Sequence, residues 1–325
     1  MPVMNAVCFV CLKHTLPMSW NNKKVGLALG GGGSRGLAHI GVLSVLEEED
    51  IGVDIIAGTS MGAIIGGAYA CGVTPRELKR MVVRYLKSPE FQSSIIHALS
   101  PDGNVADSRL ARIISGYLKS RYHMMRTLFK PGAVPLQDFQ SMINYFVPDL
   151  KIQDTRIPFR AVATDLISGE QIVFAEGSLR EAVLASCAVP GAIDPLKSGD
   201  KLLSDGGITS LVPVNVLREA GTDMVIAVTV ERNMVYNGVI KTATDVVTRA
   251  GEITAYRLKD YELEMADVVI RPKTRDSHWA DFSRASELIR DGEVAGREAL
   301  LEIHKRLPLS IRVKKFLSRF KMNQR

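Results

Sequence analysis

Two glycine-rich turns constrain the fold of this chain more than any other feature, because each joins an apolar run to a helical pattern. The first turn, residues 30–36, follows the apolar run 25–29 and precedes a helical repeat of apolar residues. The second, residues 58–62, follows the run 53–57 and opens another helical pattern. A strand, a helix and a second strand in about thirty residues form a βαβ unit, which is right-handed with parallel strands. Both turns are therefore expected at the same carboxyl edge of one sheet.

The second turn fits the pattern Gly-x-Ser-x-Gly, in which a serine stands at a sharp turn from a strand into a helix. Side chains at Gly58 and Gly62 would collide with the strand or the helix, and glycine removes that collision. The turn would also place the Ser60 hydroxyl at a helix N-terminus, where unpaired N–H groups and the helix dipole favour a developing alkoxide. Because of this position between strand and helix, the pattern predicts Ser60 as a nucleophile.

The first turn has two interpretations, since Gly31, Gly33 and Gly36 also fit the dinucleotide fingerprint Gly-x-Gly-x-x-Gly. A nucleotide site of this kind needs an acidic residue at the carboxyl end of the second strand, where it holds the ribose. Asp54 instead begins that strand, and Ser60 with its neighbours occupies the carboxyl end. We favour a nest of successive N–H groups that binds a negatively charged oxygen. A glycine loop that serves only strand–helix packing is the alternative.

A serine nucleophile requires a base, and none of the six histidines stands in a suitable pattern. His278 and His304 come late enough for the order found in α/β-hydrolases, but both lie in polar or charged segments. His39 is interpreted as a helix-surface or packing residue. No pair of histidines has metal-ligand spacing, so no metal site is predicted.

Asp205 is a better partner for Ser60, because it ends a short apolar run and is followed by Gly206 and Gly207. The two glycines would let another backbone, or the turn around Ser60, approach closely. An ordinary Asp-Gly turn is the alternative interpretation.

Together these motifs resemble the patatin-like phospholipase family, over most of the chain from Val25 to about Pro213. The resemblance rests on three motifs in order: Gly31-Gly32-Gly33-Ser34-Arg35-Gly36, Gly58-Thr59-Ser60-Met61-Gly62 and Asp205-Gly206-Gly207. Two further stretches, 161–169 and 185–195, also look like the family. The resemblance implies an α/β fold with three layers, α/β/α, around a mainly parallel central sheet.

The same resemblance implies a serine hydrolase that cleaves fatty acyl esters of membrane lipids, of the phospholipase A or lysophospholipase type, without a cofactor. It implies a Ser60–Asp205 dyad without histidine, an acyl-enzyme, and an oxyanion hole from Gly31, Gly32 and Gly33. The implied partner is a phospholipid or lysophospholipid. A non-catalytic or regulatory lipid-binding protein with the same fold and a dinucleotide-binding enzyme are the alternatives.

The remaining sequence is assigned around one domain. We expect a disordered extension at 1–22, the catalytic core at 23–215, the rest of the same α/β domain at 216–307, and a basic amphipathic tail at 308–325. The region from Thr74 to about Asp149 is expected to be largely helical, without a strand. Its amphipathic helices, one around Met124 to Phe129 and one around Phe139 to Phe146, are interpreted as an acyl-chain wall or as core packing.

Charge is concentrated at the C-terminal end of the sequence. Residues 308–325 hold six basic residues and no acidic one, which accounts for the formal net charge of +6. Wound as a helix, this segment is amphipathic, so it would lie on an anionic lipid surface or pack on the domain. No nucleic-acid partner is predicted, because base-stacking aromatics and recognition motifs are missing.

Four cysteines in a chain of 325 residues do not form a disulfide framework and indicate a reducing compartment. Cys8 and Cys11 form Cys-x-x-Cys, but no strand–helix unit surrounds them. No apolar run approaches the roughly 20 residues that span a bilayer. We therefore expect a cytoplasmic protein with peripheral contact at the inner membrane face.

Overall fold

The computed structural model describes residues 23–92, 132–134, 136–230, 240–274 and 280–307. Contacts group Lys24–Leu307 into one compact unit, apart from Met1–Lys23 and Pro308–Arg325. The predicted N-terminal extension, the basic tail and the Cys-x-x-Cys pair lie outside the described residues.

The unit is built on an eight-stranded sheet, with the order β10-β9-β1-β2-β4-β8-β7 and with β5 paired to β4. Strands β10, β9, β1, β2 and β4 are parallel, whereas β5, β8 and β7 are antiparallel to their neighbours. The predicted mainly parallel sheet is confirmed. The strands are β1 (Val25–Leu29), β2 (Ile55–Thr59), β4 (Phe159–Asp165), β5 (Gln171–Phe174), β7 (Leu196–Ser198), β8 (Lys201–Asp205), β9 (Met224–Val228) and β10 (Val268–Ile270).

The central strands β1, β2 and β9 are buried along their whole length. Parallel strands covered by helices on both faces need apolar side chains on both, so they are continuous apolar runs in the sequence. Side chains alternate between the two faces. Ala28 belongs to a core cluster on one face, and Leu29 lies on the other face, against the close approach of helix α2 at Gly66.

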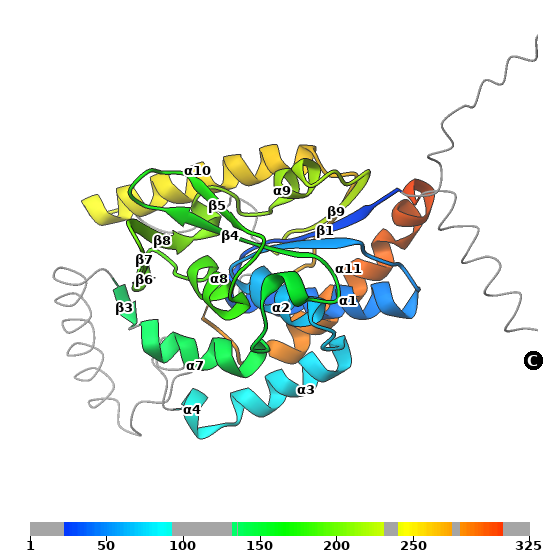
Figure 1. Ribbon diagram of the computed structural model, residues 1–325, viewed down its shortest axis with the longest axis horizontal. Helices are drawn as coiled ribbons and strands as arrows, with labels where there is room; N and C mark the ends of the chain where they lie inside the picture. Colours follow the sequence, from blue (N-terminus) through cyan, green and yellow to red (C-terminus); the bar gives the residue numbers. More distant parts are fainter. Residues whose placement is uncertain (1–22, 93–131, 135, 231–239, 275–279, 308–325) are drawn as a thin grey trace, which may run out of the picture. The chain divides into compact units, whose positions relative to one another are not determined.

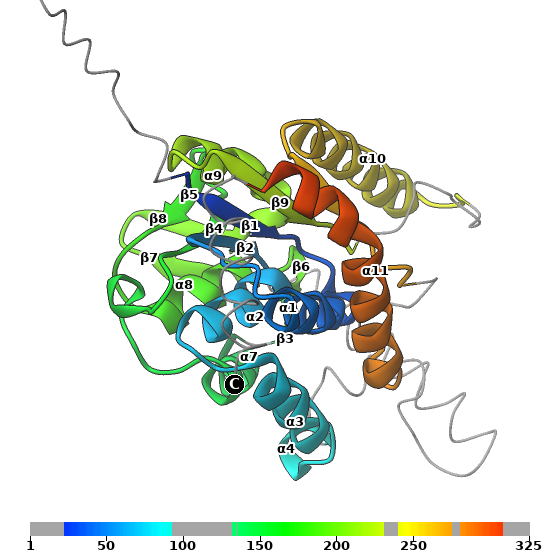
Figure 2. The ribbon, with the colours of Figure 1, turned by 90° about the vertical axis from the view of Figure 1, so that its right-hand side faces the viewer.

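Helices form a layer on each face of the sheet, which confirms the predicted three-layer fold (Figure 1). One layer contains α1 (Ala38–Glu48), α2 (Met61–Ala70), α8 (Leu179–Ser186) and α11 (Ala285–Arg306), with α11 packed along α1. The other contains α9 (Val214–Glu219) and α10 (Ala243–Glu264), and Figure 2 shows the same separation from the side. Beyond α2 lie α3 (Pro75–Leu86), α4 (Pro89–Gln92) and α7 (Leu136–Phe146).

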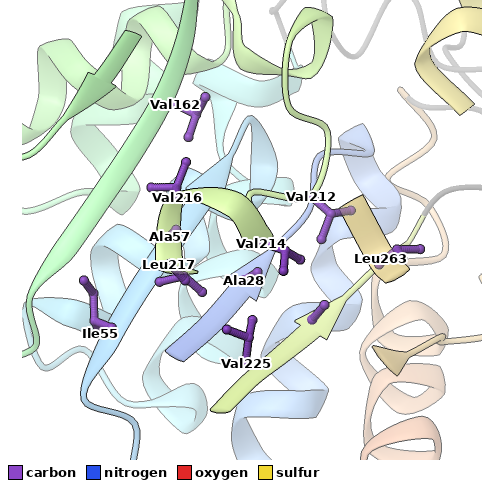
Figure 3. Packing of buried hydrophobic residues seen from close by; sticks show 11 residues of the cluster. Ala28, Ile55, Ala57, Val162, Val212, Val214, Val216, Leu217, Val225 and Leu263 are labelled. Carbon is purple, nitrogen blue, oxygen red and sulfur yellow. The ribbon is translucent and has the colours of Figure 1, made fainter. Parts of the chain in front are cut away.

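The core between the sheet and the α9–α10 layer consists of small and branched apolar residues from four sources: the strands, the loop before α9, α9 itself and the end of α10 (Figure 3). It contains Ala28, Ile55, Ala57, Val162, Val212, Val214, Val216, Leu217, Val225, Ala227 and Leu263. Burial of these side chains fixes α9 and the last turns of α10 on the sheet.

A second, small sheet corrects one sequence-based expectation. Strand β3 (Gly132–Val134) pairs in parallel with β6 (Gly191–Ile193), although no strand was expected between Thr74 and Asp149. Three residues are too few for a periodic pattern, and the pairing partner is distant in sequence. The rest of that region agrees with the prediction where it is described, in α3, α4 and α7. The predicted helix around Met124 to Phe129 lies outside the described residues.

Candidate active site

Ser60 stands between the last residue of β2 and the first residue of α2. Its backbone has φ 54 and ψ −123, and Asp50 is the other described non-glycine residue with positive φ. Such a conformation stores on the order of 1–3 kcal/mol of strain, which surrounding contacts must hold in place. The predicted collisions are present: a Cβ on Gly58 would lie 2.5 Å from the carbonyl oxygen of Gly62, and one on Gly62 would overlap the carbonyl of Leu29.

The strand register brings Ser60 and Asp205 together. Thr59, the last residue of β2, pairs with Val162 of β4, and Asp205, the last residue of β8, pairs with the next residue, Ala163. Strand β5 pairs with the same two residues of β4 and so occupies its other edge. Strands β2 and β8 therefore run toward each other along one edge of β4, and their ends meet. Ser60 follows directly after one of these ends.

The carboxylate of Asp205 is buried, with 5% of the residue exposed. One of its oxygens accepts a hydrogen bond of 2.7 Å from the Gly207 N–H. Its backbone N–H donates to the Ala188 carbonyl at 2.9 Å, and its own carbonyl accepts from the Thr164 hydroxyl at 3.1 Å. A Cβ on Gly206 would overlap the carbonyl oxygen of Val162, so the residue after Asp205 must be glycine for the chain to pass this close to β4. Asp205 is thus held by one hydrogen bond at its side chain and two at its backbone.

The two residues at the end of α8 and just after it complete the surroundings of Ser60, and neither was predicted as a site residue. Ser186 accepts a hydrogen bond of 3.0 Å from the Ser60 N–H. Burial, together with the negative charge of Asp205, raises the pKa of the Cys187 thiol well above its usual value, against a hydrogen bond with the Ser60 side chain. Cys187 is therefore a neutral thiol that contacts Ser60 and lies close enough to Asp205 to interact with its charge. In the sequence, Ser186 and Cys187 lie in the stretch 185–195 that resembles the family, but this resemblance alone did not assign them a role.

The first glycine turn lies against Ser60, because a Cβ on Gly31 would lie 3.3 Å from the Cβ of Ser60. The Gly31 N–H itself donates to the Leu211 carbonyl at 3.0 Å. This bond corrects the expectation of three oxyanion donors, since the Gly31 N–H already has a backbone acceptor. Gly32 and Gly33 remain as candidate donors, and Gly33 lines the same pocket as Ser60.

Arg35 is a buried residue that stabilises this turn. Its side chain is buried, and its Nε–H donates to the Gly32 carbonyl at 3.0 Å. The Gly32 carbonyl and the Gly33 N–H belong to one trans peptide and point in opposite directions. By holding the carbonyl, Arg35 directs the Gly33 N–H to the other side.

His39 supports the turn at its start. The residue is fully buried, and its Nε2 lies 2.8 Å from the Gly30 carbonyl oxygen. Burial lowers the pKa of His39 to about 4, against the opposing effect of this bond, so the ring is neutral at pH 7 and Nε2–H donates. The packing interpretation of His39 is confirmed and the surface one is wrong. His304 is half-exposed, 4.0 Å from Glu49, and His278 lies outside the described residues.

An apolar pocket opens at Ser60. Besides Ser60 and Gly33, it is lined by Met61, Ile64, Phe139, Met142, Cys187, Val189, Ile193 and Phe282. A second apolar pocket shares four of these residues, Met61, Ile64, Met142 and Phe282. It extends toward α3, α4 and the end of α7, where Val82, Tyr85, Leu86, Phe91 and Phe146 line it, and Leu37 and Ile65 complete its lining. Helix α7 therefore contributes both to the core and to the wall of the pocket at Ser60.

A family model described as Patatin-like phospholipase matches residues 27–218. The chain belongs to the patatin-like phospholipase family. An uncharacterized NTE family protein of Mycobacterium tuberculosis is 33% identical over 208 residues, which cover 64% of this chain and 49% of that protein. Patatin-like phospholipase domain-containing protein 6 of Mus musculus is 32% identical over 209 residues, 63% of this chain and 13% of that protein. The chain thus spans about half the length of the mycobacterial relative.

Among solved structures, VipD from Legionella pneumophila is similar over 86% of this chain and 66% of that chain, with 12% identity and a TM-score of 0.42. The patatin-like match contains all three predicted motifs and ends within α9. Helices α10 and α11 lie beyond it. Within the described ranges, no cluster of His, Cys, Asp and Glu has the make-up of a metal site, and none of the described helices is long and apolar enough to span a membrane.

Proposed function

We propose that this patatin-like protein hydrolyses fatty acyl esters of lipids, with Ser60 as nucleophile and Asp205 as general base. The proposal is carried by the pairing of Thr59 and Asp205 with consecutive residues of β4, which brings a strained serine and a buried carboxylate to one place. In this proposal no histidine takes part, because Asp205 would itself accept the proton of Ser60.

In the first half-reaction, the Ser60 hydroxyl oxygen attacks the ester carbonyl carbon and its proton passes to the Asp205 carboxylate. The tetrahedral oxyanion collapses, the ester C–O bond breaks, and the proton passes from Asp205 to the leaving alcohol. An acyl-Ser60 ester remains. In the second half-reaction, water attacks this ester and gives its proton to Asp205, which returns it to the Ser60 oxygen as the fatty acid leaves.

The N–H groups of Gly32 and Gly33 are the proposed donors to the oxyanion. Loss of one such donor typically lowers turnover by about a hundredfold or more. Arg35 and His39 would act on this step indirectly, since each holds a carbonyl of the same turn. The neutral Cys187 thiol would not compete with Ser60 as a nucleophile, because the thiolate is the reactive form.

The lining of the pocket supports a lipid acyl chain as the group bound beside Ser60. Apart from Ser60 and Gly33, its walls are apolar or sulfur-containing side chains, which favour a hydrocarbon over a sugar or a nucleotide. A phospholipid or lysophospholipid meets this requirement, and the relatives named for phospholipases agree with it. We further propose that residues 308–325, which lie outside the described part of the chain, bind anionic lipid surfaces through their basic residues.

The function is tested by reaction of the full chain with a fluorophosphonate probe and with a lysophospholipid. We expect labelling and fatty acid release by the native chain, and loss of both in Ser60→Ala. Asp205→Asn should lower fatty acid release by at least about a thousandfold, because it removes the base. Ser198→Ala and Asp200→Asn change exposed residues at the β7–β8 hairpin and serve as matched controls. Labelling that persists in Ser60→Ala would contradict the assignment of the nucleophile.

Lipid binding by the native chain without labelling or fatty acid release would instead support a non-catalytic lipid-binding protein. The role of the tail is measured separately by sedimentation with anionic vesicles. A chain that ends at Leu307 should bind them more weakly than the full chain, and equal binding would exclude the tail as the membrane contact.

A further inference from the structure

Glu262, near the end of α10, is a buried acid outside the region matched by the family model, with 2% of the residue exposed. Both of its carboxylate oxygens bind the same short loop, residues 210–212. The Ser210 hydroxyl donates to one oxygen, and the Val212 N–H donates to the other at 2.9 Å. The side chain of Glu262 thus holds both ends of the loop.

The loop in turn contacts both glycine turns of the active site. The Thr59 hydroxyl donates to the Ser210 carbonyl at 2.9 Å, directly before Ser60. The Gly31 N–H donates to the Leu211 carbonyl at 3.0 Å. The Leu211 side chain would lie 3.1 Å from a Cβ on Gly31 and 3.1 Å from one on Gly207. The three candidate catalytic segments therefore meet at this loop.

We propose that Glu262 is a positioning residue for the reaction: by holding residues 210–212, it fixes the glycine turn at Gly31 relative to Ser60. The role of the turn in catalysis rests on the function proposed above. Glu262 acts only through the loop and is not among the residues that line the pocket at Ser60.

The physical basis is the directionality of hydrogen bonds to a buried acceptor. Burial raises the pKa of Glu262 to about 7, so above this pH the side chain is a carboxylate, whose hydrogen bonds are about twice as strong as bonds between neutral groups. Burial also removes competition from water. Without the carboxylate, the Val212 N–H would be left without this acceptor in the protein interior, and the Ser210 hydroxyl would keep the Asn215 Oδ1, 3.5 Å away. This loss favours a rearranged loop. A loop that moves takes the Leu211 carbonyl away from Gly31. A small displacement of the turn would move the donors proposed for the oxyanion.

The experiment compares the full chain with Glu262→Gln, with Glu264→Gln as the matched control. Glu264 is an exposed acid two positions further along the same helix. Gln keeps the shape of Glu262 but has a single acceptor oxygen, so the Ser210 hydroxyl and the Val212 N–H can no longer each donate to an oxygen of their own. Hydrogen exchange measured by mass spectrometry on the peptide that contains Gly31 is the first readout. We expect exchange in this peptide to rise about tenfold in Glu262→Gln and to stay unchanged in the control.

This readout does not depend on enzymatic activity, so it tests Glu262 even if the proposed function fails. Unchanged exchange at Gly31 would overturn the proposal. A uniform rise in all peptides, including those of α1 and α11, would also overturn it, because it would indicate general destabilisation. If Glu262→Gln does not fold, Ser210→Ala removes one of the two hydrogen bonds to Glu262 and should give a smaller rise in the same peptide.

The second readout is hydrolysis of a soluble acyl ester. We expect Glu262→Gln to lower kcat about tenfold and to leave KM within about twofold, because the pocket is unchanged while the oxyanion donors move. A raised KM with an unchanged kcat would contradict a positioning role. If the native chain does not hydrolyse the ester, the proposed function is refuted. If exchange at Gly31 still depends on Glu262 in that case, the coupling of α10 to the turn remains supported.

Discussion

The backbone N–H of Gly31 and the carbonyl of Leu211 are joined by a hydrogen bond of 3.0 Å. This bond connects the first glycine turn to the loop after Asp205-Gly206-Gly207, far away in the sequence. It holds the turn against Ser60 and at the same time uses the N–H of Gly31. The successive glycines thus differ: the Gly31 N–H has a backbone acceptor, and the N–H groups of Gly32 and Gly33 are the proposed oxyanion donors.

A methyl group at Gly31 should disturb this arrangement without removing any hydrogen-bond donor. In Gly31→Ala, the new Cβ would lie 3.1 Å from a methyl group of Leu211 and 3.3 Å from the Cβ of Ser60. We expect kcat for a soluble acyl ester to fall by about tenfold or more, because the turn must shift away from Ser60. Gly52→Ala is the control, since nothing lies within 4 Å of its Cβ position. Equal activity of the two variants would show that the turn tolerates this displacement.

Arg35 offers a test of how the Gly33 N–H is oriented. Arg35→Met keeps much of the buried stem but removes the donor to the Gly32 carbonyl. We expect kcat to fall between about tenfold and a hundredfold with little change in KM, and Arg35→Lys to restore part of the loss. Steady-state kinetics with a soluble ester measures both constants. Arg306→Met, at an exposed ion pair on α11, is the control. A rise in KM without loss of kcat would instead assign Arg35 to substrate binding.

The second apolar pocket predicts a dependence of activity on acyl-chain length. Leu86 is half-buried at its far end, and a tryptophan there would fill space that a long chain requires. We expect Leu86→Trp to reduce hydrolysis of long-chain esters about tenfold or more relative to short-chain ones, because short chains end before Leu86. The ratio of kcat/KM between short and long p-nitrophenyl esters measures the effect. Val83→Trp, on the exposed side of α3, should leave the ratio unchanged. An unchanged ratio in Leu86→Trp would place the acyl chain elsewhere.

Much of this arrangement was predictable from local sequence. The βαβ unit, the steric need for Gly58 and Gly62, and the position of Asp205 at the end of a strand each follow from a short stretch of residues. Parallel strands put both turns at one edge of the sheet once the strand and helix patterns are recognised. Local patterns of this kind are what sequence periodicity records.

The features that were missed all depend on contacts between segments that are distant in sequence. No local pattern indicates that Leu211 uses the N–H of Gly31, or that Glu262 holds the loop beneath it. Cys187 lies beside Ser60 only because α8 packs beneath β4. The three-residue strand β3 has no periodic signal, since its pairing with β6 is what defines it. In each case the missing information was the tertiary pairing and not the chemistry of the residue.

The buried His39 predicts a dependence of stability on pH. Its pKa in the folded protein is about 4, below its ordinary value of 6.5, so folding favours the neutral ring. The stabilisation is fully present above pH 6.5 and is lost as the pH falls toward 4, by an amount on the order of 3 kcal/mol. His39→Gln keeps an N–H donor for the Gly30 carbonyl but does not titrate. The free energy of unfolding in urea should therefore fall more steeply for the native chain than for His39→Gln between pH 6.5 and 4. Burial raises the pKa of Glu262 to about 7, so protonation of Glu262 adds stability as the pH falls over part of this range. Both proteins contain Glu262, so this contribution cancels when their free energies of unfolding are compared at each pH. Parallel pH profiles would contradict the assignment of a neutral, buried His39.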